Sequence, residues 1–173
     1  MDANALYAEA KQVYEAGNRD ESVGLFEQAR AAYIAAGDEA QAAAVANDLG
    51  VVYYLVGRQD QARQALQDAL TTQEKLGNVL GQAKALGNLA QLMNRAGDKE
   101  AAEKNYQQAA VLFHQVGERM MEYDTFRALS QMQLQRGRWI EALGAYDFAL
   151  GAKGGSGALR WFLRIPLKLL RIR

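Results

Sequence analysis

The side chains that carry out most enzymatic chemistry are scarce in this sequence. Its 173 residues include one histidine, His114, and no cysteine. Cysteine nucleophiles and disulfides are therefore excluded, and an ordinary metal site built from several nitrogen or sulfur ligands cannot be assembled. His114 lies in QQAAVLFHQ, a stretch typical of a helix, where a single histidine is more often structural or solvated than catalytic. We expect a non-catalytic protein with no metal and no cofactor.

A glycine-rich run, GAKGGSG at residues 151–157, has the composition of a phosphate-binding loop. Such a loop needs Gly-Lys followed by Ser or Thr and a strand before it, and this run has neither. We interpret residues 151–157 as a flexible linker between a body, residues 1–150, and a tail, residues 158–173. Carboxylates are numerous, but they lie in helical stretches of mixed charge, and nothing singles out an acid and base pair.

The tail differs from the rest of the chain in charge. All 20 acidic residues and 15 of the 20 basic ones lie in residues 1–157, a formal charge of −5, whereas residues 158–173 carry +5. On a helix, four of the five basic side chains would form a stripe within an arc of roughly 80°, beside a wide apolar face: Arg160, Arg164, Lys168 and Arg171. This amphipathic pattern predicts a tail that contacts an anionic membrane surface without spanning it. The residues expected at the membrane are Arg160, Trp161, Phe162, Arg164, Lys168 and Arg171.

The tail is also compatible with a different structure and with different contacts. Pro166 would kink a helix, and strand-like alternation fits the same residues. The tail could instead cover the last hairpin of the body or occupy the body's own groove, which would be autoinhibitory. A nucleic-acid partner is not expected, because the tail has many aliphatic residues and few polar side chains that read bases.

The body is organised by evenly spaced glycines. Glycines recur every 20 residues from Gly17 to Gly137, and their sequence contexts alternate, so the full period is 40 residues with two helices in each repeat. A glycine just past a helix end adopts the left-handed conformation that terminates the helix. The Asp, Asn or Glu that soon follows suits the start of the next helix. Repeats of this length indicate stacked helical hairpins.

Aligning the repeats reveals positions that admit only small residues, as expected where the backbones of paired helices approach closely. They are Ala10, Gly50, Ala90 and Ser130; Ser22, Ala62, Ala102 and Ala142; and Ala29, Ala69, Ala109 and Ala149. Large residues such as Phe26, Leu66 and Tyr106 alternate with them. We therefore predict an all-α fold, a right-handed α-solenoid of about four helical hairpins.

These residues carry a family resemblance. ALGNLA at residues 85–90, Asp48-Leu49-Gly50 with Tyr53, and the alternation of alanine with large residues resemble tetratricopeptide (TPR) repeats. The 40-residue spacing resembles the longer variety rather than the 34-residue one. Repeat 1 departs from the pattern at Glu9 and repeat 4 at Gln133, as end repeats often do.

The resemblance implies a protein–protein interaction adaptor or scaffold, whose first helices line a concave groove that holds an extended peptide or a partner helix. Gly87 stands where chaperone-tail readers carry a lysine, which argues against a simple reader of C-terminal carboxylates. Asn88 is the sharpest candidate, because an amide both donates and accepts hydrogen bonds, as a peptide unit requires. The positions carried over from the family are Asn47, Tyr54, Lys84, Asn88, Gln91, Asn94, Arg127 and Gln131.

The location expected from the sequence is the cytoplasm, with reversible attachment to a membrane surface through the tail. The N-terminal stretch MDANALYAEAKQVYEAG contains acidic residues and no long apolar run, unlike a secretory signal. No stretch reaches the roughly 18 consecutive apolar residues of a spanning helix.

Overall fold

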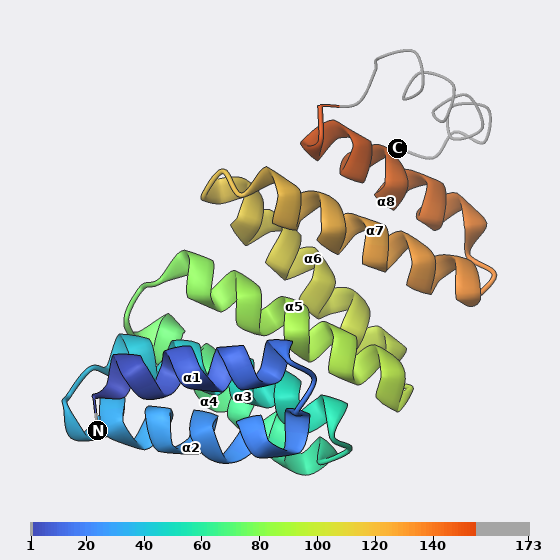
Figure 1. The fold of residues 1–173 in the computed structure, drawn as a ribbon. Helices are drawn as coiled ribbons and strands as arrows, with labels where there is room; N and C mark the ends of the chain where they lie inside the picture. Colours follow the sequence, from blue (N-terminus) through green and yellow to red (C-terminus); the bar gives the residue numbers. More distant parts are fainter. Residues whose placement is uncertain (1, 155–173) are drawn as a thin grey trace. The chain divides into compact units, whose positions relative to one another are not determined.

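The computed structural model describes residues 2–154, which form eight α-helices joined by short turns (Figure 1). The helices are α1 (Ala3–Glu15), α2 (Arg19–Ala35), α3 (Glu39–Leu55), α4 (Gln59–Lys75), α5 (Val79–Ala96), α6 (Lys99–Gln115), α7 (Arg119–Gln135) and α8 (Trp139–Ala152). The described part of the chain contains no strand. This confirms the all-α helical repeat predicted from the sequence.

The helix ends lie where the glycine spacing predicts them. All seven glycines of the series from Gly17 to Gly137 have positive φ angles, between 65° and 92°, in the left-handed region that favours glycine. The following helix is capped by a side chain in several repeats. Asp38 and Asp98 accept hydrogen bonds from the backbone N–H groups of Gln41 and Ala101, at 3.0 and 3.2 Å. Each of these two turns therefore combines a glycine that ends one helix with an aspartate that begins the next.

The chain forms two compact units, residues 1–92 and 93–173. In the first unit, α1 packs on α2, α2 on α3, and α3 on α4, while the C-terminal half of α5 supplies Leu89 and Leu92 to the same core. The most deeply buried large side chains of this core are Phe26, Leu49 and Leu66. The first unit is thus a stack of helical hairpins with a continuous apolar interior.

In the second unit, α6 packs on α7 and α7 on α8. Met132 of α7 is deeply buried, with 1% of its surface exposed. A charged cluster joins the elements at one end: the carboxylate of Glu103 accepts hydrogen bonds from Arg136 at 3.2 Å and Arg138 at 2.6 Å. These arginines flank the turn between α7 and α8, so the ion pairs connect that turn to α6.

The positions predicted to hold small residues are buried in both units. All twelve are buried, and most of them have no surface in contact with solvent. Gly50 shows why size matters: a Cβ placed there would lie 2.6 Å from Cγ of Leu66 and 3.2 Å from the carbonyl oxygen of Ala62. The close packing of α3 against α4 depends on the absence of this side chain.

The last helix ends near the predicted start of the linker. The linker was expected to begin at residue 151, and α8 ends at Ala152, followed by Gly154 with a φ of 76°. The boundaries of the body, linker and tail stay a prediction. The rest of the linker and the tail lie outside the described residues, and the right-handed superhelix stays a prediction.

Candidate functional site

A chain of hydrogen bonds connects the first helices of three successive repeats in the first unit. Tyr7 of α1 donates from its hydroxyl to Oδ2 of Asp48 in α3, at 2.6 Å. Asn47 donates from Nδ2 to Oδ1 of Asp48, at 3.2 Å, and Asn88 of α5 donates from Nδ2 to Oδ1 of Asn47, at 3.0 Å. We call Tyr7, Asp48, Asn47 and Asn88 the polar chain.

The repeat places these residues side by side. Tyr7 and Asn47 occupy the same position of successive repeats, and Asp48 and Asn88 occupy the next position. Equivalent positions of α1, α3 and α5 face one another across successive repeats, so side chains 41 residues apart in sequence reach one another. All four members of the polar chain are half-buried and thus accessible to a ligand.

The electrostatics fix the hydroxyl of Tyr7 as a donor. Burial, followed by the hydrogen bond to Asp48, raises the pKa of Tyr7 well above its ordinary value of 10.0. The hydroxyl therefore stays protonated at neutral pH and continues to donate to the carboxylate. The ammonium group of Lys11 lies 4.2 Å from the centre of the Tyr7 ring, a cation–π contact that adds a positive charge at the α1 end of the polar chain.

The two asparagines retain hydrogen-bonding capacity. An amide side chain offers two N–H groups and a carbonyl oxygen with two lone pairs. Within the polar chain, Asn88 uses one N–H, and Asn47 uses one N–H and one lone pair. Both can therefore also bind the N–H and C=O groups of a peptide laid across α3 and α5. Because each is held by a neighbour, little side-chain entropy would be lost on binding.

The other predicted residues of the first unit lie on the same helices. Lys84 and Gln91 are exposed and lie on the same side of α5 as Asn88, at i−4 and i+3. Tyr54 of α3 is half-buried and packs against the core of the unit. The structure therefore gathers five of the eight predicted residues, Asn47, Tyr54, Lys84, Asn88 and Gln91, in one unit, on α3 and α5.

The remaining three predicted residues belong to the second unit. Asn94 accepts a hydrogen bond from Nζ of Lys99 at 2.7 Å. Arg127 pairs with Asp124 at 3.1 Å and lies over the ring of Tyr123, and Gln131 is exposed. Asn94 and Arg127 thus make local contacts within the second unit and are not part of the polar chain.

The sequence interpretation missed Tyr7, Asp48 and Lys11. A signal was present, because Tyr7 stands 40 residues before Asn47 and Asp48 is the next residue after it. Comparing neighbouring repeat positions together, rather than one at a time, would have identified Tyr7 and Asp48.

The residues proposed to contact a membrane, Arg160 to Arg171, lie outside the described residues. Within residues 2–154, no helix combines the length and apolar character needed to cross a bilayer. The same residues contain no cluster of three or more histidine, cysteine or carboxylate side chains placed to hold a metal ion. His114 has a largely exposed side chain, and its Nδ1 lies 3.1 Å from the buried carboxylate of Glu122.

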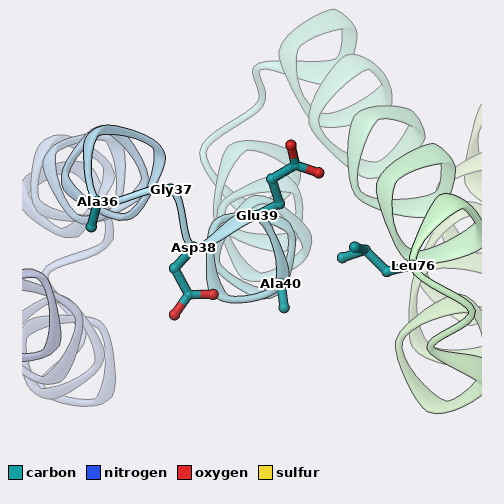
Figure 2. A pocket seen from close by; sticks show the side chains of 6 residues that line it. All are labelled: Ala36, Gly37, Asp38, Glu39, Ala40 and Leu76. Carbon is teal, nitrogen blue, oxygen red and sulfur yellow. The ribbon is translucent and has the colours of Figure 1, made fainter.

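Two hollows mark the part of the first unit formed by α2, the start of α3, and α4. One, of about 460 Å³, lies between the turn at Gly37–Asp38 and Leu76, and Figure 2 shows the carboxylates of Asp38 and Glu39 beside it. The other, of about 310 Å³, has three alanines of α3 among its lining residues and the ion pairs Arg30–Asp68 and Lys75–Glu39 at its sides. Neither hollow contains a binding residue predicted from the sequence.

Comparison with known proteins agrees with this architecture. Residues 2–75 match the model of the tetratricopeptide repeat family. No curated protein matches the chain.

Solved structures show the same fold at low sequence identity. BtubC (BKLC) from P. vanneervenii has a TM-score of 0.78 and 19% identity, over 88% of this chain and 63% of that one. MamA has a TM-score of 0.67 and 16% identity, over 88% of this chain and 78% of that one. A putative kinesin light chain from Podosopora anserina, with nearly identical TPR-like repeats, has a TM-score of 0.67 and 14% identity, over 97% and 94%. The chain spans less than two thirds of the length of BtubC.

Proposed function

We propose that this tetratricopeptide-repeat protein is a non-catalytic adaptor that binds an extended peptide of a partner protein along α1, α3 and α5. Tetratricopeptide repeats are generally protein–protein interaction modules. The proposal adds where on this protein the peptide binds. The polar chain is the observation that supports it. Asn47 and Asn88, held 3.0 Å apart on neighbouring repeats, present amide groups to the surface where a peptide backbone could pair with them.

The polar chain also suggests what the ligand must supply. Asp48 places a carboxylate beside the amides, and Lys84 and Lys11 add cations on α5 and α1. A peptide that combines extended backbone with charges of both signs would complement this surface. The proposal therefore describes a backbone-directed site flanked by charges.

The test begins with a peptide selected from a random library for binding to the full chain, whose affinity is then measured by calorimetry. Replacing Asn88 by alanine should weaken binding roughly five- to tenfold, because a hydrogen bond is worth about 1 kcal/mol. Asn47→Ala should weaken it at least as much, since it also releases Asn88. The matched control is Gln28→Ala, an exposed amide on α2, which should leave the affinity unchanged.

The result that overturns the assignment is a selected peptide whose affinity survives both asparagine substitutions while all variants remain helical. The affinity of the Arg127→Ala variant tests whether the peptide binds to the second unit instead. Loss of binding in that variant alone would move the site to α7.

The membrane attachment predicted from the tail is a separate proposal about residues 158–173. It is supported by the charge of +5 in that segment against −5 in the rest of the chain. The proposed location is the cytoplasm, and only the part of the proposal that puts some of the protein at a membrane surface depends on this segment. The test is co-sedimentation of the full chain with anionic vesicles at low salt, which should be lost when residues 158–173 are removed. No vesicle binding by the full chain, together with a lower melting temperature of the shortened chain, would favour the alternative that the segment covers the last hairpin.

A further inference from the structure

Asp48 is a half-buried acid without a cationic partner. Its carboxylate accepts hydrogen bonds from two neutral donors, the hydroxyl of Tyr7 at 2.6 Å and the amide of Asn47 at 3.2 Å. It forms no ion pair with any basic side chain in the part of the chain that the structure describes. Removing a charge partly from water is costly unless an opposite charge lies beside it. Within residues 2–154, the charge of Asp48 is therefore uncompensated.

The two other half-buried acids within the described helices are each paired with an arginine. Asp68 of α4 accepts from Arg30 at 3.1 Å, and Glu103 of α6 accepts from Arg136 at 3.2 Å. Both pairs connect successive hairpins, as the bond from Tyr7 to Asp48 does. Asp48 is thus the exception among these three acids, and it lies in the middle of the polar chain.

The repeat does not require a charge at this position. The equivalent residues of the other repeats are Ala8, Asn88 and Ala128, all of them neutral. An asparagine, which has a carbonyl oxygen, could still accept the hydrogen bond from Tyr7. The negative charge of Asp48 is therefore additional to what the packing and the bond from α1 need.

Lys11 of α1 does not serve as a counter-ion for Asp48. Its ammonium group lies 4.2 Å from the centre of the Tyr7 ring and forms no ion pair. Its side chain is exposed, so water and salt screen its charge. A carboxylate has about four lone-pair sites, and two of those of Asp48 are used, so it can still accept hydrogen bonds from a cation of a ligand.

We propose that the peptide bound along α1, α3 and α5 contains an arginine or lysine whose side chain pairs with Asp48. This inference rests on the proposed function and adds the class of residue that the site selects. The pair forms beside the amides of Asn47 and Asn88, so the basic side chain and the backbone of the ligand bind at adjacent points. A hydrogen bond between a cation and a carboxylate is stronger than a neutral one, and an acidic residue at the same point is repelled.

The test begins by screening the full chain against two random peptide libraries that differ only in the presence of lysine and arginine. The complete library should yield binders that carry a basic residue. The best binders from the library without lysine and arginine should be at least about tenfold weaker, because they lack the charge-assisted hydrogen bond to Asp48.

A double-mutant cycle then tests the pair directly, with affinities measured by calorimetry. Each basic residue of a selected peptide is replaced in turn by glutamine. One of these replacements should weaken binding to the unaltered protein about tenfold, but should change binding to the Asp48→Asn variant by less than about twofold. Binding to the unaltered protein should also weaken more steeply with added salt than binding to the variant. Circular dichroism checks that the variant stays helical.

The matched control is Asp68→Asn on α4, which neutralises a half-buried carboxylate outside the polar chain. This change should leave both the affinity and its salt dependence unaltered. Asp48→Glu, which keeps the charge on a longer side chain, should retain part of the coupling with the basic residue of the peptide.

Additive effects of the peptide replacements and Asp48→Asn, or equal affinities from the two libraries, would overturn this inference. If Asn47→Ala and Asn88→Ala still weaken binding in that case, the proposed function stands without it. Coupling at Asp48 with no effect of either asparagine substitution would support the cation site and contradict the role given to the amides. The absence of binders from both libraries would contradict the proposed function and this inference together.

Discussion

At the scale of single residues, the molecule depends on side chains that are small or absent. The hairpin of α3 and α4 closes over Gly50, where even a methyl group would meet Leu66. Small buried residues such as this one allow the two helices of a hairpin to approach closely. The polar chain, in contrast, joins helices of successive hairpins, as in the bond from Asn88 to Asn47.

Replacing Gly50 by leucine should lower the free energy of unfolding by about 3 kcal/mol, because the added side chain overpacks the hairpin. Gly50→Ala should already be destabilising, although alanine favours a helix. The matched control is Gly24→Ala in α2, where a Cβ would meet nothing within 4 Å. That change should stabilise the protein by about 0.5–1 kcal/mol, the ordinary benefit of replacing glycine within a helix.

Denaturant unfolding of the three variants measures these differences. Equal effects of Gly50→Ala and Gly24→Ala would contradict the close approach described for α3 and α4.

At the scale of helices, the residues at each turn determine where a helix ends. Residues that differ from the repeat pattern are accommodated by the surroundings of their side chains. Glu9, which replaces the usual leucine in repeat 1, is exposed on α1. Gln133, which stands where an aromatic residue is usual, is buried and donates to Glu103 at 3.0 Å. Glu9 is tolerated because the first repeat has an open side where a charge meets solvent. Gln133 is tolerated because its buried amide has the carboxylate of Glu103 as a hydrogen-bond partner.

The caps offer a test at this scale. Asp38→Ala removes the hydrogen bond to the N–H of Gln41 at the start of α3, and should lower the free energy of unfolding by about 1 kcal/mol. Asp98→Ala should do the same at α6. Asn18 begins α2 without a side-chain cap, so Asn18→Ala should change the stability little. A comparable loss in all three variants, measured by urea unfolding, would show that these aspartates stabilise the protein in some other way.

At the scale of the whole molecule, the chain is a repeat protein divided into two compact units. In such architectures each repeat contacts mainly its neighbours, so stability is roughly a sum over repeats and their interfaces. The zero net charge of the whole chain conceals opposite charges of its two parts, −5 in residues 1–157 and +5 in residues 158–173.

Truncating the core of one unit should therefore act mainly within that unit. Leu49→Ala removes a side chain that is 2% exposed in the first unit, and should lower the free energy of unfolding by about 2–5 kcal/mol. Hydrogen exchange should accelerate in α1 to α4 more than in α7 and α8. Met132→Ala, in the second unit, should give the opposite distribution. Uniform acceleration throughout the chain in both variants would mean that the repeats unfold only as one cooperative body.

The sequence by itself determined the helices, their ends and the residues that pack between them. The alternating glycine contexts placed every turn from Gly17 to Gly137, because a left-handed residue after a helix and a polar residue before the next are local requirements. The small residues revealed the hairpin interfaces, because close packing admits few alternatives.

Only the tertiary structure decided which polar side chains meet. The bonds from Tyr7 to Asp48 and from Asn88 to Asn47 join residues 41 apart, and nothing in either local segment specifies a partner. Contacts between distant helices combine the geometry of several elements, so they emerge only when those elements are packed together.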